Sequence, residues 1–202
     1  MDETALIQAA QDGDLDAFNR LVLAYQDMVY NQAYRVMGET DAAEDATQEA
    51  FISAYQKLYT YRGGSFRGWL LRIVTNSCYD EFRRRKRQPI TALKPHNDDG
   101  DEIESPRWMV DPGESPENAL LRAELADAIQ YCLNKLKPKF RIAVVLVDVQ
   151  GLDYAEAASV IECPLGTVRS RLSRARRRLQ QCLQQFRELL PSAFRLREEA
   201  SP

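Results

Sequence analysis

The chain has 202 residues, of which 45% are hydrophobic, 28% charged and 9% aromatic, and its formal net charge is −3. This composition is typical of a globular protein of one or two domains and excludes a fibrous or wholly disordered chain. No apolar run approaches the roughly 18 residues of a membrane span, and the acidic N-terminus does not resemble a signal peptide. We therefore expect a cytoplasmic protein without membrane insertion.

The cysteines and the histidine exclude several kinds of site. Cys78, Cys132, Cys163 and Cys182 show no C-x-x-C spacing, and His96 is the only histidine. Structural zinc sites use closely spaced cysteine and histidine pairs, and disulfide frameworks are typical of short secreted chains. We expect no metal, no cofactor, no disulfide framework and no histidine-based catalytic triad.

Charge is distributed unevenly along the chain. Residues 1–61 hold eleven acidic and three basic side chains, whereas residues 62–90 hold eight basic and two acidic ones. Residues 91–118 are acidic, eight against two, and residues 163–190 are basic, seven against one. Two basic segments separated by acidic ones indicate two contacts with a polyanion and favour nucleic acid over two ordinary solvated helix faces.

Residues 1–61 predict about three helices, because apolar residues recur at helical spacing and Gly13 and Gly38 mark the breaks. Ser65 can cap a further helix that runs to about Arg87 and ends before Pro89. One broad side of this helix is apolar and is expected to be buried: Phe66, Leu70, Leu71, Ile73, Val74, Cys78 and Phe82.

The composition changes at residues 91–116, where prolines interrupt an acidic stretch that predicts a flexible linker. A second helical unit over residues 117–190 follows the cap Ser115 and leaves 191–202 as an unassigned tail. Its valine-rich stretch, Ala143 to Val147, has no partner strand, so we expect a buried helix there. The predicted fold is all-α, with two small helical domains joined by an acidic linker.

The second unit contains the pattern of a helix-turn-helix. Asp153 and Glu156 form a capping-box pattern before a short helix, residues 162–166 form a turn, and Thr167 opens a second helix. The apolar residues of this second helix share one stripe, and its opposite face is basic. The stripe consists of Val168, Leu172, Ala175, Leu179 and Cys182.

A helix of this kind enters the DNA major groove, where arginine donates bidentately to guanine and serine bonds to base edges. We expect its exposed N-terminal half to read bases and its other polar residues to contact mainly phosphates. For any single arginine, an ordinary surface position is a fair alternative. The expected base readers are Arg169, Ser170, Ser173 and Arg174, and the expected phosphate contacts include Thr167, Arg171, Arg176 and Arg177.

The basic helix of the first unit predicts a different contact. Arg72, Asn76, Tyr79 and Arg83 fall on one exposed face, with Trp69 beside them. An aromatic ring, an amide and arginines on one face suit unpaired bases, which need stacking surfaces and edge hydrogen bonds. For Trp69 alone, a half-buried core position fits equally well.

Taken together, the motifs resemble those of a bacterial sigma factor of the extracytoplasmic-function (ECF, group IV) type, over nearly the whole chain. Their order and spacing make the resemblance specific. The motifs are Asp41-Ala-Ala-Glu44-Asp45-Ala-Thr-Gln48-Glu49-Ala-Phe51, Trp69-Leu-x-Arg72-Ile73, Asn76-x-x-x-Asp80-x-x-Arg83 and Pro164-Leu-Gly166-Thr167-Val168-Arg169-Ser170-Arg171.

The resemblance implies a promoter-specificity subunit of RNA polymerase, which is not an enzyme. A region-2-type domain, residues 1–90, would bind core polymerase and melt the −10 element, and a region-4-type domain, residues 117–190, would read the −35 element. The partners implied are the β′ clamp helices and β subunit of core polymerase, duplex and melted promoter DNA, and an anti-sigma factor.

The resemblance also implies residue roles. Docking on the β′ clamp helices falls to Asp41, Glu44, Asp45, Gln48 and Glu49, although an acidic solvated face is an alternative for this helix. Contacts at the −10 element, including a pocket wall for a flipped base and a hold on the duplex backbone, fall to Arg62, Ser65, Phe66, Trp69, Arg72, Asn76, Tyr79, Asp80, Arg83, Arg84 and Arg85.

Two other function classes remain open from the residues alone. One is a conventional helix-turn-helix regulator whose first half senses a ligand or dimerises, and such a protein would bind a palindromic site. The other is a phosphate- or nucleotide-handling enzyme, which the absence of a Gly-rich phosphate loop disfavours.

Overall fold

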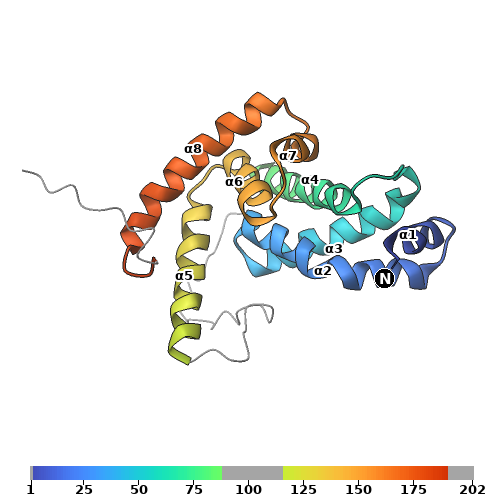
Figure 1. The fold of residues 1–202 in the computed structure, drawn as a ribbon, viewed down its shortest axis with the longest axis horizontal. Helices are drawn as coiled ribbons and strands as arrows, with labels where there is room; N and C mark the ends of the chain where they lie inside the picture. The colour runs from blue at the N-terminus through green and yellow to red at the C-terminus, as the bar shows by residue number, and fades with distance from the viewer. Residues whose placement is uncertain (1, 88–115, 191–202) are drawn as a thin grey trace, which may run out of the picture.

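The computed structural model describes residues 2–87 and 116–190, and these residues form helices joined by short turns, without strands. The N-terminal unit comprises α1 (Glu3–Gln11), α2 (Leu15–Met37), α3 (Thr40–Lys57), the short η1 (Leu58–Thr60) and α4 (Phe66–Arg87). The C-terminal unit comprises α5 (Pro116–Asn134), α6 (Pro138–Val144), the π-helical turn η3 (Val145–Val149), α7 (Tyr154–Ile161), α8 (Leu165–Leu183) and η4 (Gln184–Phe186). Figure 1 shows α7 lying over α4 and α8 running outward from it. The predicted linker, apart from Pro116, and the predicted tail lie outside the described residues.

The helix boundaries follow from local capping. Asp14 accepts hydrogen bonds from Asp16 N and Ala17 N at the start of α2, and Gly38 ends that helix in the left-handed region with φ 79°. The Ser65 hydroxyl oxygen accepts from Gly68 N at 3.0 Å, which confirms the predicted cap of α4.

Small residues on α3 allow close packing in the N-terminal unit. Its inward stripe consists of alanines, so α2 and α4 can approach it closely, and the apolar side of α4 is buried as predicted, with Phe82 half-buried at its end. The buried residues of these two faces are Ala42, Ala43, Ala46, Ala50 and Ala54 on α3, and Phe66, Leu70, Leu71, Ile73, Val74 and Cys78 on α4.

The valine-rich stretch of the C-terminal unit is helical, as expected. It begins as α6 and widens into the π-helical turn η3, where Gln150 N donates to Val145 O at 2.8 Å. Val145 and Leu146 are fully buried, whereas Asp148 in the same turn is exposed enough to reach a neighbouring helix.

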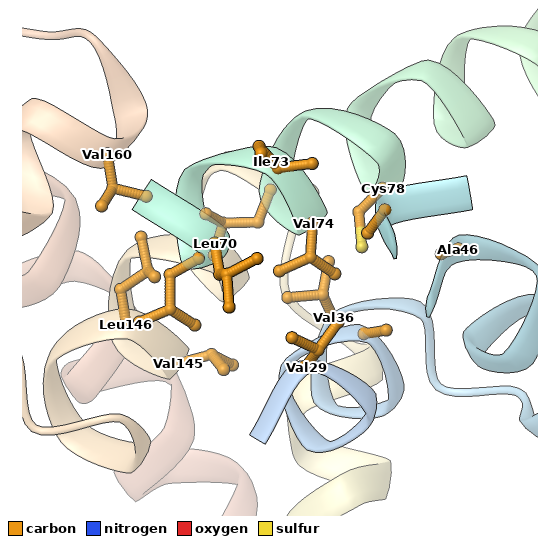
Figure 2. Packing of buried hydrophobic residues seen from close by; sticks show 14 of the residues in the cluster. Val29, Val36, Ala46, Leu70, Ile73, Val74, Cys78, Val145, Leu146 and Val160 are labelled. Carbon is orange, nitrogen blue, oxygen red and sulfur yellow. The ribbon is translucent and has the colours of Figure 1, made fainter. Parts of the chain in front are cut away.

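The two units share one hydrophobic core. Figure 2 shows Val29 and Leu70 of the N-terminal unit pointing toward Val145, Leu146 and Val160 of the C-terminal unit. The sequence predicted two domains on a linker but not that they would pack against each other. This contact fixes how the two predicted DNA-binding faces sit relative to one another.

A buried arginine joins the units at the ends of two helices. Arg141 Nη1 donates to Val36 O at 2.6 Å, and its Nη2 donates to Asn134 O at 2.8 Å and Leu136 O at 3.3 Å. The carbonyls of Val36 and Asn134 belong to the C-terminal ends of α2 and α5, where they lack intrahelical partners and attract positive charge, and Leu136 lies in the turn after α5. Burial lowers the pKa of Arg141, but a guanidinium stays protonated in proteins.

The sequence predicted no disulfide framework, and the structure contains one disulfide among the described residues. Cys132 on α5 and Cys182 on α8 form a disulfide with a Cα–Cα distance of 5.7 Å. The two cysteines are 50 residues apart in sequence, and only the packing of α5 against α8 brings them together. The spacing of the cysteines in the sequence does not indicate such a pair.

Candidate nucleic-acid interface

The helix-turn-helix is built as the capping pattern predicts. Asp153 Oδ1 accepts from Glu156 N at 2.8 Å, and Glu156 Oε2 accepts from Asp153 N at 2.9 Å. The left-handed residue that ends α7 is Glu162, with φ 53°, and the following helix begins at Leu165, earlier than the expected Thr167. The reason is Pro164, whose fixed φ suits a helix start and whose carbonyl accepts from Thr167 N at 2.8 Å.

The outer face of α8 is open to solvent over its first half. Val168, Leu172 and Ala175 are buried, as the predicted stripe requires, with Leu179 half-buried beyond them. Arg169 and Arg174 are exposed and form no ion pair with a described residue. The exposed face thus presents two unengaged guanidinium groups and two hydroxyls, whose residues are Arg169, Ser170, Ser173 and Arg174.

The remaining polar residues of α8 differ in environment. Thr167 and Arg171 are half-buried, with Arg171 Nη1 3.9 Å from Cys163 Sγ, while Arg177 is exposed. Arg176 binds Asp148 through two contacts, Nε to Oδ2 at 3.0 Å and Nη2 to Oδ1 at 2.5 Å. The hydrogen bonds to Asp148 raise the pKa of Arg176.

An aromatic cluster supports the predicted −10 face. Trp69 is half-buried and stacks on Phe66 with ring centroids 5.4 Å apart, and Tyr61 meets both rings edge-on. Phe66 is only 1% exposed, so it lies beneath the predicted pocket wall and supports it from inside. The neighbouring Arg62 and Ser65 are exposed.

Part of this face is covered by the C-terminal unit. Arg72 forms an ion pair with Glu162, and Tyr79 is half-buried close to Arg171, with its pKa raised mainly by burial. A hollow of about 300 Å³ separates the loop and start of α4 from α7. Its lining includes Arg62, Ser65, Trp69 and Arg72 on one side and Glu156, Ser159 and Val160 on the other.

The basic end of α4 carries its own counter-charges. Arg83 pairs with Asp80 at 2.9 Å, Arg84 pairs with Glu81 at 2.7 Å, and Arg85 reaches both Glu81 and Glu39. The Arg83–Asp80 pair joins two exposed side chains and is weak, so Arg83 can exchange Asp80 for a phosphate, whereas Glu81 is only 13% exposed and holds Arg84 and Arg85 more firmly.

The predicted polymerase-docking residues lie along one exposed side of α3. Asp41, Glu44, Asp45, Gln48 and Glu49 are all exposed. A hollow of about 480 Å³ lies between α3 and α4, and its lining includes Asp45, Gln48, Glu49, Asn76, Asp80 and Arg84. The acidic side and the Asn76 side of the N-terminal unit therefore border the same hollow.

Sequence reasoning missed three residues that hold these surfaces: Asp148, Tyr154 and Glu162. The position of Asp148, an acid within the valine-rich run at 144–149, could have indicated that it has a partner. No feature of the neighbouring sequence indicates a role for Tyr154 or Glu162. Among the described residues no group of three or more His, Cys, Asp or Glu side chains could hold a metal ion, and no helix is long and apolar enough to cross a membrane.

Two family models match the chain in the order of its units. Sigma-70 region 2 matches residues 21–88, and Sigma-70 region 4 matches residues 126–179. The first covers most of α2 to α4 and the second spans the helix-turn-helix.

Two curated relatives agree with the family models. The chain is 39% identical over 181 residues to "ECF RNA polymerase sigma factor SigE" of Mycolicibacterium smegmatis, covering 89% of this chain and 67% of the relative. It is 38% identical over 184 residues to "RNA polymerase sigma-H factor" of Pseudomonas aeruginosa, covering 89% and 92%. The chain belongs to the ECF RNA polymerase sigma factors of the sigma-70 family. It is thus a transcription initiation factor that binds core RNA polymerase and promoter DNA, and not an enzyme.

Two solved structures share the fold. The sigma factor RpoE of Bartonella quintana, in complex with the anti-sigma factor NepR, is similar with a TM-score of 0.63 and 28% identity over 84% of this chain and 98% of that one. CnrH in complex with the cytosolic domain of CnrY is similar with a TM-score of 0.61 and 26% identity over 89% and 95%.

Proposed function

We propose that residues 117–190 read the −35 element and that residues 1–90 bind core polymerase and recognise and melt the −10 element, with residues 91–116 as the linker. The observation that carries this division is the exposed face of α8, where unengaged arginines stand opposite a buried apolar stripe. Direct reading of bases needs such donors held on a fixed helix.

At the −35 element, Arg169, Ser170, Ser173 and Arg174 contact base edges in the major groove. Thr167, Arg171 and Arg177 lie beside this face and contact the DNA backbone. Contacts to phosphates set the register of the helix, and contacts to bases give sequence preference.

At the −10 element, the loop with Arg62 and Ser65 forms a wall of the pocket for a base flipped out of the non-template strand. Trp69, Arg72, Asn76, Tyr79 and Asp80 line the path of the melted strand, and Arg83, Arg84 and Arg85 hold the duplex backbone. Unstacking costs a few kcal/mol per step, and capture of the extruded base offsets it, so melting requires no ATP.

Core polymerase is bound through α3. Its exposed residues Asp41, Glu44, Asp45, Gln48 and Glu49 meet the β′ clamp helices, and the β subunit supplies further contacts. The alanines on the opposite side of α3 are buried, so the acidic side is free for a basic partner. The protein acts in the cytoplasm, where its polymerase is.

An anti-sigma factor controls the protein. The similar RpoE structure is a complex with the anti-sigma factor NepR, and this chain matches that sigma factor over 84% of its length. A protein that covers α3 or α4 would compete with both polymerase and the −10 strand, because the two surfaces border one hollow.

Run-off transcription with purified core polymerase on a genomic library tests the proposal. The expected result is initiation at a set of sites with two shared, asymmetric elements. Failure to direct polymerase to any site, together with unaided binding to a symmetric operator, would contradict it and favour a conventional regulator.

A further inference from the structure

One ion pair ties the DNA-reading helix to the core of its unit. The Asp148 carboxylate receives two hydrogen bonds from the Arg176 guanidinium, at 3.0 and 2.5 Å. Arginine and carboxylate match as two planar forks, so the paired bonds fix orientation as well as distance.

The acidic partner, Asp148, lies in a turn that is anchored in the core. Asp148 belongs to η3, whose Val145 and Leu146 are fully buried in the shared core (Figure 2). Tyr154 opens α7, the first helix of the helix-turn-helix. Arg176 is therefore held to η3, which precedes α8 in the chain.

The anchor adjoins the reading face. Arg176 follows Ser173 by three residues and Arg169 by seven, so all three lie on neighbouring turns of one helix side. The same residues, with Tyr154 and Arg177, line a shallow hollow along α8. A shift of Arg176 would move the base-reading side chains directly.

The pairing also argues against Arg176 as a phosphate contact. Its Nε and Nη2 already donate to Asp148, and the carboxylate beside them repels a phosphate. By contrast, the adjacent Arg177 is exposed and pairs with no carboxylate among the described residues.

We propose that Asp148 is a positioning residue for −35 recognition, which holds α8 through Arg176, and that Arg176 is an anchor and not a DNA contact. This inference rests on the proposed function of α8.

Holoenzyme is reconstituted with four variants: Asp148→Ala, Arg176→Ala, the double variant and Arg177→Ala. Binding of each to a promoter returned by the run-off screen is measured over a series of salt concentrations. Asp148→Ala and Arg176→Ala should each weaken binding about tenfold, and the double variant no further, because the same pair is broken in all three. The slope of log affinity against log salt should stay unchanged in these variants and fall by about one in Arg177→Ala.

A forked template that carries the −10 element but lacks the −35 element separates positioning from general damage. On this template all Asp148 and Arg176 variants should bind like the wild type, and Asp148→Glu should recover most of the loss on the full promoter. Equal losses on both templates would overturn the inference. A reduced salt slope for Arg176→Ala with no effect of Asp148→Ala would also overturn it and make Arg176 a phosphate contact.

Thermal unfolding of the free chain separates this inference from the proposed function. The melting-temperature shifts of Asp148→Ala and Arg176→Ala should be non-additive in the double variant, whether or not any promoter is found. Additive shifts would refute the pair itself. Non-additive shifts with no promoter found would contradict the proposed function and, with it, the positioning role.

Discussion

Arg72 on α4 and Glu162 at the turn before α8 form an ion pair that joins the predicted −10 face to the helix-turn-helix. The Arg72 and Glu162 side chains are 47% and 60% exposed, so water competes with the pair and its strength is small. Under the proposed function, Arg72 must leave Glu162 before it can contact the −10 strand.

Replacement of Glu162 by Gln should free Arg72 without altering the backbone. The affinity of the free chain for a single-stranded −10 oligonucleotide should rise by up to about fivefold at low salt, because an exposed ion pair contributes about 0.2–1 kcal/mol. The gain should vanish at high salt. Fluorescence anisotropy measures the affinity for the oligonucleotide at low and at high salt, with Glu124→Gln on α5 as control. Equal affinities for Glu162→Gln and wild type would contradict the prediction.

Arg174→Ala should cost about 1–3 kcal/mol in binding at the cognate −35 element and relax sequence preference there. The reason is that Arg174 is exposed on the reading face and has no carboxylate partner among the described residues. Competition binding against −35 variants measures both effects. A loss that is uniform over all −35 sequences would instead assign Arg174 to the backbone contacts.

Charge reversal of Asp45 and Glu49 to Lys should abolish pull-down of core polymerase. Both side chains are exposed on α3 and support no described ion pair, so the fold should persist by circular dichroism. The same reversal at Asp12 and Asp16, exposed near α1 and α2, provides a control of equal charge. Unchanged pull-down by the α3 variant would argue against docking through this face.

Gly38→Ala should destabilise the contact between the units. Gly38 has φ 79°, and a Cβ there would lie 2.1 Å from Asn134 Oδ1, which accepts from Gln130 Nε2. Gly13→Ala shares the unfavourable φ but has open space, so it isolates the backbone cost of roughly 1–2 kcal/mol. In urea unfolding Gly38→Ala should cost more than Gly13→Ala, and the excess should disappear when Asn134 is also Ala. Equal costs of the two glycine variants would show that the close approach is not needed.

Arg141→Met should lower the free energy of unfolding by about 2–4 kcal/mol. The substitution keeps an unbranched side chain but leaves the carbonyls of Val36, Asn134 and Leu136 without their donor. Arg177→Ala, on the surface, should stay within about 0.5 kcal/mol of wild type. Denaturant melts of the two variants compare these values, and a loss below about 1 kcal/mol for Arg141→Met would mean that water replaces the guanidinium.

Helix caps and buried helix faces could be predicted from the sequence, because they depend on residues that are neighbours along the chain. The Ser65 cap, the Asp153–Glu156 capping box and the buried stripe of Val168, Leu172 and Ala175 all follow from spacing within one or two turns, and the structure confirms them. The acidic, proline-interrupted composition of residues 91–116 indicated the division into two units, and the two family models match the separate parts of the chain.

Interactions between segments that are distant in the sequence could not be predicted from the spacing of residues. The burial of Arg141 at two helix ends, the covering of Tyr79 by the C-terminal unit and the Asp148–Arg176 pair each depend on how helices pack in space. A periodic pattern tells which side of a helix is buried but not which helix covers it. For the same reason an exposed position for Arg176 could be predicted and its partner could not.

The Cys132–Cys182 disulfide turns the chain between these residues into a closed ring that contains α6, η3, α7 and most of α8. A protease that nicks the backbone once at the exposed Gly151 would therefore release no fragment. The two pieces would stay attached through sulfur and would migrate as one species until a reductant is added.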